Sequence, residues 1–530
     1  MKNRWLVAGL LMVAAGVSLW DAPAEAAKTA SSHPFLLIGM DGGEWKVIED
    51  LWSRGELPAL KSVADRGIRG PLGTQYGQSP VIWTTIATGV TPEVHGITGF
   101  VVATDDGDVP VSSTMRRVPA LWNIASAANL KVNVIGWWGS WPAEQVNGVV
   151  LTEKAQYNQP DIIWPAERAA EVKAALPALN AEYADAFPGD ANFAPEDRVT
   201  AHFAPKLTAE GFDAQFMYLH GSDPNSHRFW RYYRPQDFEE KIPQAQIDRH
   251  KDKVPDAYRS IDAVIGRVLA AAPSDVNVMI VSDHGFHPLE RVTTKVVMDM
   301  DDVLERLGYL KRDASGQVDY AQSRAYTVGT RQTEKDKRIH FNVKGRDPSG
   351  VVDAAQVDAL RAQLTADLAR LTYKRSGTAV FDLRDPDPRD AERGADVTVR
   401  VLDDQPSKTL LLDGSTELKG IVQSMVENSG GHSGDPPGIF LAAGPDIDPK
   451  GNIQGISVLD IAPTALYAMG LPVADDFVGK PYVELFNDKY RKAHPLQTIP
   501  SYGQREFSNT QKAGDNDAML EQLRELGYID

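Results

Sequence analysis

An acid and an imidazole stand side by side directly after one apolar run of the chain. Asp283 and His284 follow residues 278–281, which are all apolar and have the pattern of a buried parallel strand. Burying both groups is unfavourable unless something compensates them. We interpret the pair as ligands of a bound cation, although a single buried histidine is more often a hydrogen-bonded core residue. His287 follows closely and is a further candidate site residue.

Two more apolar runs end in polar side chains of the same kinds. Asp41 follows residues 34–40, where Asp-Gly is also a common turn sequence. Asp223 and His227 follow residues 214–221 and are spaced i, i+4. On a helix this spacing places both side chains on one face, where they could hold one cation. The alternative is that Asp223 caps the helix and His227 lies on an exposed first turn.

A glycine-rich segment and a Ser-Pro pair provide the remaining candidates. His432 lies within residues 430–434, whose glycines allow the backbone to approach a site closely, although a flexible loop has the same composition. Ser79 precedes Pro80 and an apolar helical pattern, which predicts Ser79 as the N-cap and Pro80 as the first helical residue. The start of a helix favours a bound anion, so this hydroxyl is also placed to attack a phosphate.

These residues together have the donor groups of two Zn²⁺ sites and one nucleophile. The chain contains no cysteine, so a metal site must use imidazole, carboxylate and hydroxyl ligands. One shared site explains the separate motifs better than several coincidences. The predicted site contains Asp41, Ser79, Asp223, His227, Asp283, His284 and His432.

The elements that must position these residues alternate between strands and helices. Short apolar runs at 34–40, 131–137, 214–221, 276–283 and 438–444 predict buried strands, with helical patterns between them. This alternation predicts an α/β fold with a mostly parallel central sheet sandwiched by helices. Sites in such sheets form beyond the carboxyl ends of the strands, where the motifs occur.

The alternation breaks between about residues 289 and 425, which predicts a small inserted α+β cap. We expect this cap to cover the metal cleft and to shape the pocket for the leaving group. The predicted organisation is a signal peptide at 1–26, a discontinuous catalytic core at 34–288 and 426–486, the cap at 289–425, and a C-terminal tail at 487–530.

The N-terminus has the three-part plan of a secretory signal peptide. Lys2 and Arg4 precede a 16-residue run that is apolar apart from Ser18, and Ala24-Glu25-Ala26 forms an A-x-A cleavage signal. The run is short of the roughly 20 residues that span a bilayer. We expect cleavage, a periplasmic or secreted protein, and no stable membrane anchor; an uncleaved anchor is the alternative.

The net charge of −17 bears on the partners of the chain. An acidic surface argues against nucleic acid or anionic membrane as a standing partner. It leaves a small anionic substrate open, because a bound metal ion can reverse the local sign of the potential.

The motifs together resemble the alkaline phosphatase superfamily, in particular its type I phosphodiesterase/nucleotide pyrophosphatase branch. The resemblance extends over nearly the whole chain after the signal. It rests on the segments "IGMDGGEW", "SPVIWTTIATGVTPEVHGI", "GSDPNSHRFW", "VSDHGF", "GGHSGDPPGIFLAAGP" and "VLDIAPTALYAMGLP".

The resemblance implies a role for each ligand. One metal ion would be held by Asp223, His227 and His432. The second would be held by Asp41, Asp283 and His284, with Ser79 at its open position.

Two sequence features narrow the set of activities within the superfamily that this chain resembles. Sulfatases carry a C/S-x-P-x-R motif, and "SPVIW" lacks both its spacing and its arginine, which argues against a sulfatase. Nucleotide pyrophosphatases have an asparagine shortly after "HGI" that contacts a phosphate oxygen, whereas this chain has Phe100. Phe100 is therefore a pocket candidate, as are Trp83, Trp137 and His287, although packing is the alternative role for the tryptophans.

The resemblance implies a phosphohydrolase with two divalent ions, most simply Zn²⁺, and the N-terminal signal pattern predicts that it is exported. We expect it to cleave phosphodiesters through a covalent phosphoserine on Ser79, with the two metal ions about 4 Å apart. A nucleotide, a glycerophosphodiester or a lipid head group remain open as substrates. The alternatives are a phosphomonoesterase, a transferase of phosphoryl or head groups in the same superfamily, or an exported binding protein without catalysis.

Overall fold

The computed structural model describes most of the chain after the predicted signal. It covers residues 31, 33–104, 107–157, 159–186, 195–328, 335–386, 388–392, 394–403, 405–450, 453–508, 520 and 523. The predicted signal peptide, residues 1–26, lies outside the described residues. Among the helices in these ranges, none is both long enough and apolar enough to cross a membrane.

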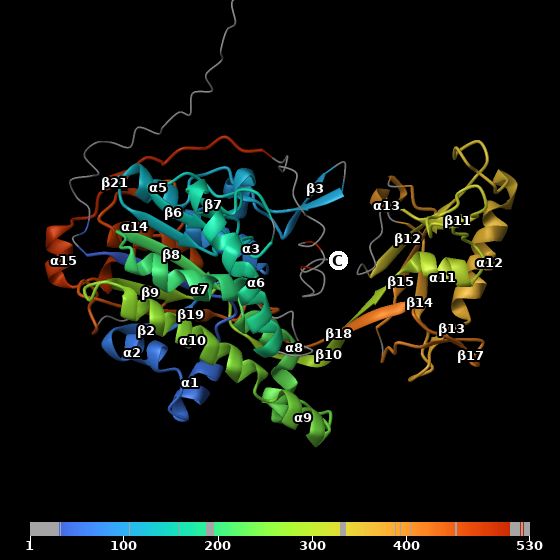
Figure 1. The fold of residues 1–530 in the computed structure, drawn as a ribbon, viewed down its shortest axis with the longest axis horizontal. Coiled ribbons are helices and arrows are strands. Elements are labelled where there is room, and N and C mark those ends of the chain that lie inside the picture. The colour runs from blue at the N-terminus through green and yellow to red at the C-terminus, as the bar shows by residue number, and fades with distance from the viewer. Residues whose placement is uncertain are drawn as a thin grey trace, which may run out of the picture.

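The core is an eight-stranded sheet flanked by helices (Figure 1). In spatial order its strands are β2 (Ile68–Leu72), β19 (Gly438–Ala443), β9 (Asn277–Val281), β1 (Phe35–Met40), β8 (Ala214–Leu219), β5 (Val132–Ile135), β6 (Gly148–Leu151) and β7 (Ile163–Trp164). The five strands from β9 to β6 are parallel to one another. The predicted α/β fold with a mostly parallel central sheet is therefore confirmed.

The edges of the sheet differ from a fully parallel arrangement. The predicted strand at residues 438–444 forms β19, but it pairs antiparallel with β9 and with β2. At the other edge β7 pairs antiparallel with β6. The motifs of Asp41, Asp223 and Asp283 follow strands of the parallel part, whose carboxyl ends lie at one edge of the sheet.

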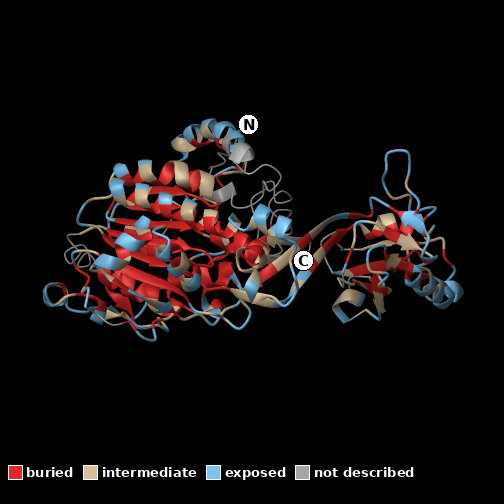
Figure 2. Ribbon diagram, turned by 90° about the horizontal axis from the view of Figure 1, so that it is seen from below, coloured by how far each residue is buried: buried red, intermediate tan, exposed pale blue. Residues whose placement is uncertain are grey.

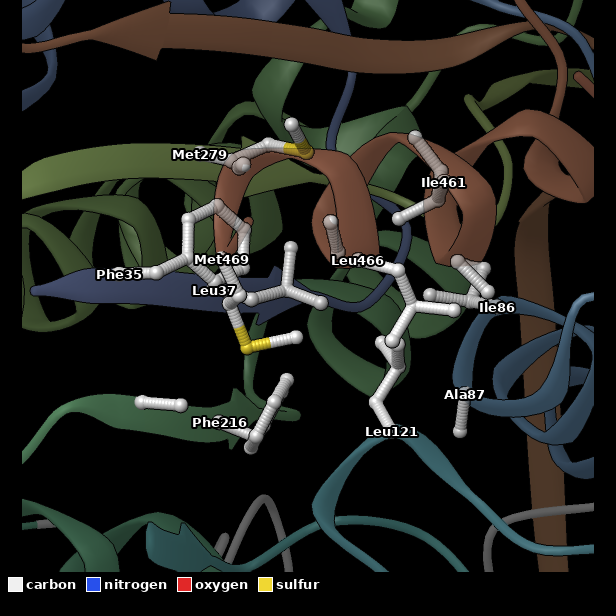
Figure 3. Packing of buried hydrophobic residues seen from close by; sticks show 14 of the residues in the cluster. Phe35, Leu37, Ile86, Ala87, Leu121, Phe216, Met279, Ile461, Leu466 and Met469 are labelled. Carbon is white, nitrogen blue, oxygen red and sulfur yellow. The ribbon is translucent and has the colours of Figure 1, made fainter. Parts of the chain in front are cut away.

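The sheet is buried on both faces, as the apolar runs predict. Alternate side chains of β1 enter two separate clusters, with Phe35 and Leu37 on one face and Leu36 and Ile38 on the other. Figure 3 shows how Leu466 of α14 packs over Leu37 on the first face. The principal helices around the sheet are α1 (Trp45–Ser53), α2 (Pro58–Arg66), α3 (Ser79–Thr88), α5 (Leu121–Ala127), α6 (Ala169–Ala186), α7 (Pro195–Ala209), α8 (Ser222–Tyr233), α10 (Lys253–Ala271) and α14 (Ile461–Ala468).

A two-stranded ribbon leads from the core to the insertion. Its strands β10 (His287–Met298) and β18 (Val422–Gly431) pair antiparallel. The insertion has its own hydrophobic cluster, which includes Leu364 of α12 (Val357–Ala369). Its strands form two antiparallel sheets, β11 (Ala325–Thr327), β12 (Asp336–Phe341), β15 (Val397–Val401) and β14 (Phe381–Arg384) in one, and β13 (Leu371–Tyr373), β16 (Leu410–Leu412) and β17 (Thr416–Leu418) in the other.

The insertion does not lie over the metal-site edge of the sheet, so the expectation that it covers the cleft is wrong for this structure. Figures 1 and 2 show it at the far end of the ribbon, away from the core. The physical reason is the length of β10 and β18, of 12 and 10 residues, whose pairing keeps the two bodies apart.

The C-terminal tail packs on the core wherever the structure describes it. The backbone N–H of Arg505 donates to the carbonyl of Arg117, and that of Ser508 donates to the carbonyl of Thr114. Leu523 is buried against Phe100. Of residues 509–530 in this tail, only Leu520 and Leu523 are among the described residues.

Candidate active site

Three neighbouring strands deliver the acidic side chains to one place. Asp41 directly follows β1, Asp283 closely follows β9, and Asp223 lies in the first turn of α8, just after β8. β9, β1 and β8 are adjacent in the sheet, so their carboxyl ends meet at one edge. All three carboxylates are fully buried.

The donor atoms form two groups that could each hold a metal ion. Asp41, Asp283 and His284 offer ligand atoms that all lie within 4.8 Å of one another. Asp223, His284 and His432 form a second group by the same distance. His284 belongs to both groups, so the two are contiguous.

His227 lies beside the second group, although that group contains His284 where the resemblance implies His227. Its Nε2 is 3.4 Å from Oδ1 of Asp223, and its ring centroid is 5.2 Å from that of His432. All six predicted ligands are therefore gathered at one edge of the sheet.

The charges of this cluster fit divalent cations. Burial, and next the neighbouring carboxylates of Asp41 and Asp223, raise the pKa of Asp283 well above its usual value. Burial lowers the pKa of His227 to about 4 and that of His432 to about 2, so both imidazoles are neutral at pH 7. Oδ2 of Asp283 is buried and makes no hydrogen bond. Two dications would neutralise the carboxylates and use the imidazole lone pairs.

Backbone carbonyls fix the orientation of the histidine rings. Nδ1 of His227 lies 3.0 Å from the carbonyl oxygen of Gly430, and Nδ1 of His284 lies 3.0 Å from that of Gly285. An Nδ1–H that donates to a carbonyl leaves Nε2 free to bind a metal ion. Gly430 is required here, because a Cβ would lie 2.4 Å from the carbonyl oxygen of Ser226.

Ser79 opens the buried helix α3, and its hydroxyl faces the ligand cluster. Its Oγ lies 3.5 Å from Oδ1 of Asp41 and 3.5 Å from Nε2 of His284. The prediction that Ser79 is the N-cap is wrong by one position, since Gln78 is the cap and Ser79 is the first helical residue. Because its side chain does not cap the helix, the hydroxyl remains free for chemistry.

Three of the predicted pocket residues are buried aromatic side chains, and the fourth, His287, is partly buried. Trp83 and Trp137 are fully buried and pack edge to face at 5.4 Å, with Trp83 reaching the ligand Asp41. Phe100 packs edge to face on Trp138 at 5.7 Å. His287 is partly buried, and its Nε2 lies 2.8 Å from the carbonyl oxygen of Ser433, next to His432. His287 thus contacts the loop that carries a predicted ligand.

Sequence reasoning missed the groups that surround Asp41 and Asp223. The hydroxyl of Tyr218 donates to Oδ2 of Asp41. The carboxylate of Asp197 accepts from the backbone N–H groups of His220 and Gly221, just before Asp223. A tyrosine near the end of a mostly apolar strand is a weak signal for such a role, and Asp197 gives none.

Comparison with known proteins supports the family. Residues 35–403 match the family described as type I phosphodiesterase/nucleotide pyrophosphatase. Among proteins with curated sequence records, none matches this chain.

Solved structures show distant similarity. Murine ectonucleotide pyrophosphatase/phosphodiesterase 5, an inactive variant in complex with AMP, is 14% identical and covers 86% of this chain and 100% of its own, with a TM-score of 0.43. Phosphonoacetate hydrolase from Sinorhizobium meliloti 1021 is 15% identical over 82% and 96%, with a TM-score of 0.41. The wild-type alkaline phosphatase PafA is 13% identical over 86% and 100%, with a TM-score of 0.44.

The family match covers more than half of the chain, including β1, Ser79 and the Asp283-His284 pair. The chain belongs to the type I phosphodiesterase/nucleotide pyrophosphatase family of phosphohydrolases.

Proposed function

We propose that this protein is an exported two-metal phosphodiesterase that works through a phosphoserine on Ser79. The observation that supports this most directly is the position of the Ser79 hydroxyl. It lies 3.5 Å from Asp41 and 3.5 Å from His284, so one nucleophile faces ligand atoms of both donor groups.

Two Zn²⁺ ions are the cofactors that the donor set fits best. Asp41, Asp283 and His284 would hold one ion, and Asp223, His227 and His432 would hold the other. When bound, the ions supply positive charge for the phosphate oxygens and acidify hydroxyl groups beside them. The absence of thiol ligands and the neutral imidazoles agree with this assignment.

Ser79 performs the chemistry in two displacements. In the first, Oγ gives up its proton and forms a bond to phosphorus while the bond to the leaving alcohol oxygen breaks, and that alcohol takes up a proton. In the second, a water oxygen bonds to phosphorus, the Oγ–P bond breaks, and Oγ regains a proton. The start of α3 stabilises the negative phosphoryl oxygens through the helix dipole.

The surroundings of Phe100 favour a diester over a monoester. Its ring is buried against Trp138 and Leu523, and we propose that Phe100 and Trp138 form an apolar wall of the substrate pocket. An aromatic ring cannot donate a hydrogen bond to the additional charged oxygen of a monoester. A diester has an ester oxygen and a carbon substituent in place of that charged oxygen, which an apolar wall accepts at lower free-energy cost.

A small phosphate ester is the proposed substrate, with a nucleotide, a glycerophosphodiester and a lipid head group as the candidates. Export is proposed from the signal-like pattern in residues 1–26. The acidic chain is not expected to bind nucleic acid.

The test compares bis-p-nitrophenyl phosphate with p-nitrophenyl phosphate on the purified, zinc-loaded protein. We expect a higher kcat/KM for the diester. We also expect Ser79→Ala to retain both metal ions and to lose turnover by at least about 1,000-fold. Full turnover by Ser79→Ala, or wild-type protein that binds no metal, would refute the proposal.

A further inference from the structure

The two carboxylate oxygens of Asp41 have different surroundings. Oδ1 faces the reaction side, 3.5 Å from Oγ of Ser79 and 3.6 Å from Nε2 of His284. Oδ2 faces away from it and accepts two hydrogen bonds, one from Nε1 of Trp83 at 3.0 Å and one from the hydroxyl of Tyr218. One oxygen is therefore already engaged by the protein, and the other points toward the nucleophile and His284.

Tyr218 is itself held by hydrogen bonds. Nε1 of Trp138 donates to its hydroxyl oxygen at 2.7 Å, and Nδ1 of His220 lies 2.8 Å away. A phenol has a single proton, and the carboxylate of Asp41 cannot donate one, so that proton goes to Asp41. The hydroxyl oxygen then accepts from Trp138 and from the Nδ1–H of His220. The resulting chain of bonds runs from Trp138 through Tyr218 to Asp41.

Packing makes this geometry rigid. The ring of Trp83 stands edge to face on that of Tyr218, with centroids 5.0 Å apart. It also rests on Gly39, where a Cβ would lie 2.6 Å from the indole ring, so only glycine leaves room for it. Trp83 and Tyr218 are both buried. The side chain of Asp41 is thus confined from the side opposite to Ser79.

We propose that Tyr218 is a positioning residue that makes Asp41 a single-oxygen metal ligand, with Trp138 as its support. The proposal rests on the proposed two-metal function. Hydrogen bonds to the second oxygen fix the direction of the first and prevent the carboxylate from turning to bind with both oxygens. Groups that hold a ligand in this way typically change metal affinity by about 10–100-fold when they are removed.

The connection through Trp138 also links the metal ligand to the apolar wall. The ring of Trp138 packs on Phe100, while its N–H supports Tyr218. One residue therefore contacts both the proposed substrate wall and the hydrogen-bond chain that ends on Asp41. A substrate substituent that packs against this wall would contact Trp138, and through Trp138 and Tyr218 it would influence the position of the Asp41 carboxylate.

The decisive variant is Tyr218→Phe, which keeps the ring packing on Trp83 and removes only the hydroxyl. Tyr502→Phe is the matched control, because Tyr502 is also buried and its hydroxyl donates to the carbonyl of Pro472 at 2.6 Å, away from the ligand cluster. Zinc affinity is measured on the full chain by competition with a chelator of known affinity, together with the metal content and the unfolding temperature without metal.

We expect Tyr218→Phe to bind one of the two zinc ions about 10–100-fold more weakly and to recover turnover when zinc is added in excess. Tyr502→Phe should bind both ions with wild-type affinity. Trp138→Phe, which keeps an aromatic ring against Phe100, should weaken the same ion by a smaller factor.

Two results would overturn the inference. The first is wild-type affinity for both ions in Tyr218→Phe, with or without a lower unfolding temperature, since the hydroxyl would then have only a structural role. The second is an equal loss of affinity in Tyr502→Phe. Failure of the wild-type protein to bind two ions is a different outcome, because it would refute the proposed function itself.

Discussion

Histidines with nearby carboxylates occur in two regions of this molecule, with opposite surroundings. In the insertion, His340 uses both ring nitrogens, one 2.8 Å from Oδ1 of Asp347 and the other 2.6 Å from the carbonyl oxygen of Gly394. At the edge of the core sheet, Asp283 has a buried oxygen with no hydrogen bond and lies among other carboxylates. His340 and Asp347 are hydrogen-bonded by the protein in the insertion, whereas one carboxylate oxygen at the sheet edge has no hydrogen-bond partner.

The contrast gives a physical criterion for a site. A buried polar group without a partner destabilises the fold by about 1–3 kcal/mol, so an array of them is unstable unless a ligand compensates it. In the insertion, the hydrogen bonds of His340 and Asp347 stabilise a body with its own hydrophobic cluster. At the sheet edge, Oδ2 of Asp283 has no such hydrogen bond and lies 3.3 Å from Nε2 of His284.

The strongest test of this contrast exchanges one carboxylate for an amide in each region. Asp283→Asn should reduce turnover of bis-p-nitrophenyl phosphate by at least about 100-fold through loss of metal. Its metal-free form should unfold at the same or a higher temperature, because like charges are removed. Asp347→Asn should leave turnover unchanged and lower the free energy of unfolding by about 2 kcal/mol. The reverse pattern would contradict the contrast.

Lys154, at the same edge of the sheet, is a buried cation without a hydrogen-bond partner, so the same comparison of partnered and unpartnered groups can be made for a positive charge. Lys154 follows β6, and its ammonium group is buried without a hydrogen-bond partner, 4.2 Å from the centroid of the Trp141 ring. Burial lowers the pKa of Lys154 to about 8, although the charge of Glu153 acts in the opposite direction. Lys154→Met should therefore stabilise the protein below pH 8, by less than the shift alone implies because Glu153 loses its counter-charge.

The pH dependence of this gain follows from the direction of the pKa shift. Between pH 8 and 10.5 the folded protein loses the proton of Lys154 before the unfolded chain does, so wild-type stability rises with pH in this window. The advantage of Lys154→Met should shrink over the same window. Denaturant unfolding at pH 7 and pH 10 checks this, and a loss of stability in the variant at pH 7 would show that the ammonium group is structurally required.

Zinc should protect the two regions unequally. At a free concentration 100 times the dissociation constant, a ligand that binds only the folded state stabilises it by about 2.7 kcal/mol. Hydrogen exchange should slow in β1, β8 and β9, next to the donor groups. It should stay unchanged in β12 and β15 of the insertion, and equal protection of both regions would argue against a site confined to the sheet edge.

The smallest expected effect concerns the apolar wall. Phe100→Asn introduces a hydrogen-bond donor at the proposed apolar wall, where the resemblance implies a contact to a phosphate oxygen. The ratio of kcat/KM for diester to that for monoester should fall by about tenfold, the equivalent of one hydrogen bond of about 1.4 kcal/mol. Phe100→Leu, which remains apolar, should keep the wild-type ratio. An unchanged ratio in Phe100→Asn would place Phe100 outside the substrate contacts.

Much of the core could be predicted because its signals are local. Apolar runs specify the buried strands, and the parallel arrangement explains why Asp41, Asp223 and Asp283 converge. The antiparallel pairing of β19 could not be predicted, since a buried run has no direction of its own. The role of Tyr218 depends on a side chain 177 residues away in the sequence, and no periodicity records such a contact.

The position of the insertion was also beyond local signals. The sequence indicates the insertion by a break in the strand–helix alternation. Its distance from the core, however, depends on the length over which β10 and β18 pair. The burial of Phe100 depends in the same way on Leu523, at the opposite end of the chain. Distant residues could be predicted to meet where each follows a buried parallel strand, as Asp41 and Asp283 do, but not where the contact depends on a particular side chain or on a chain end.

The ribbon also divides the chain into parts that can be exchanged. β10 begins three residues after His284, and β18 ends immediately before His432, so every residue of the outer body is attached at the two histidine loops. Lys295 and Val426 face each other across the antiparallel pair, close enough for a two-residue Asn-Gly hairpin to join them. Such a hairpin would replace more than a hundred residues without touching a strand of the sheet. The core that carries the candidate site could in this way be produced without the outer body.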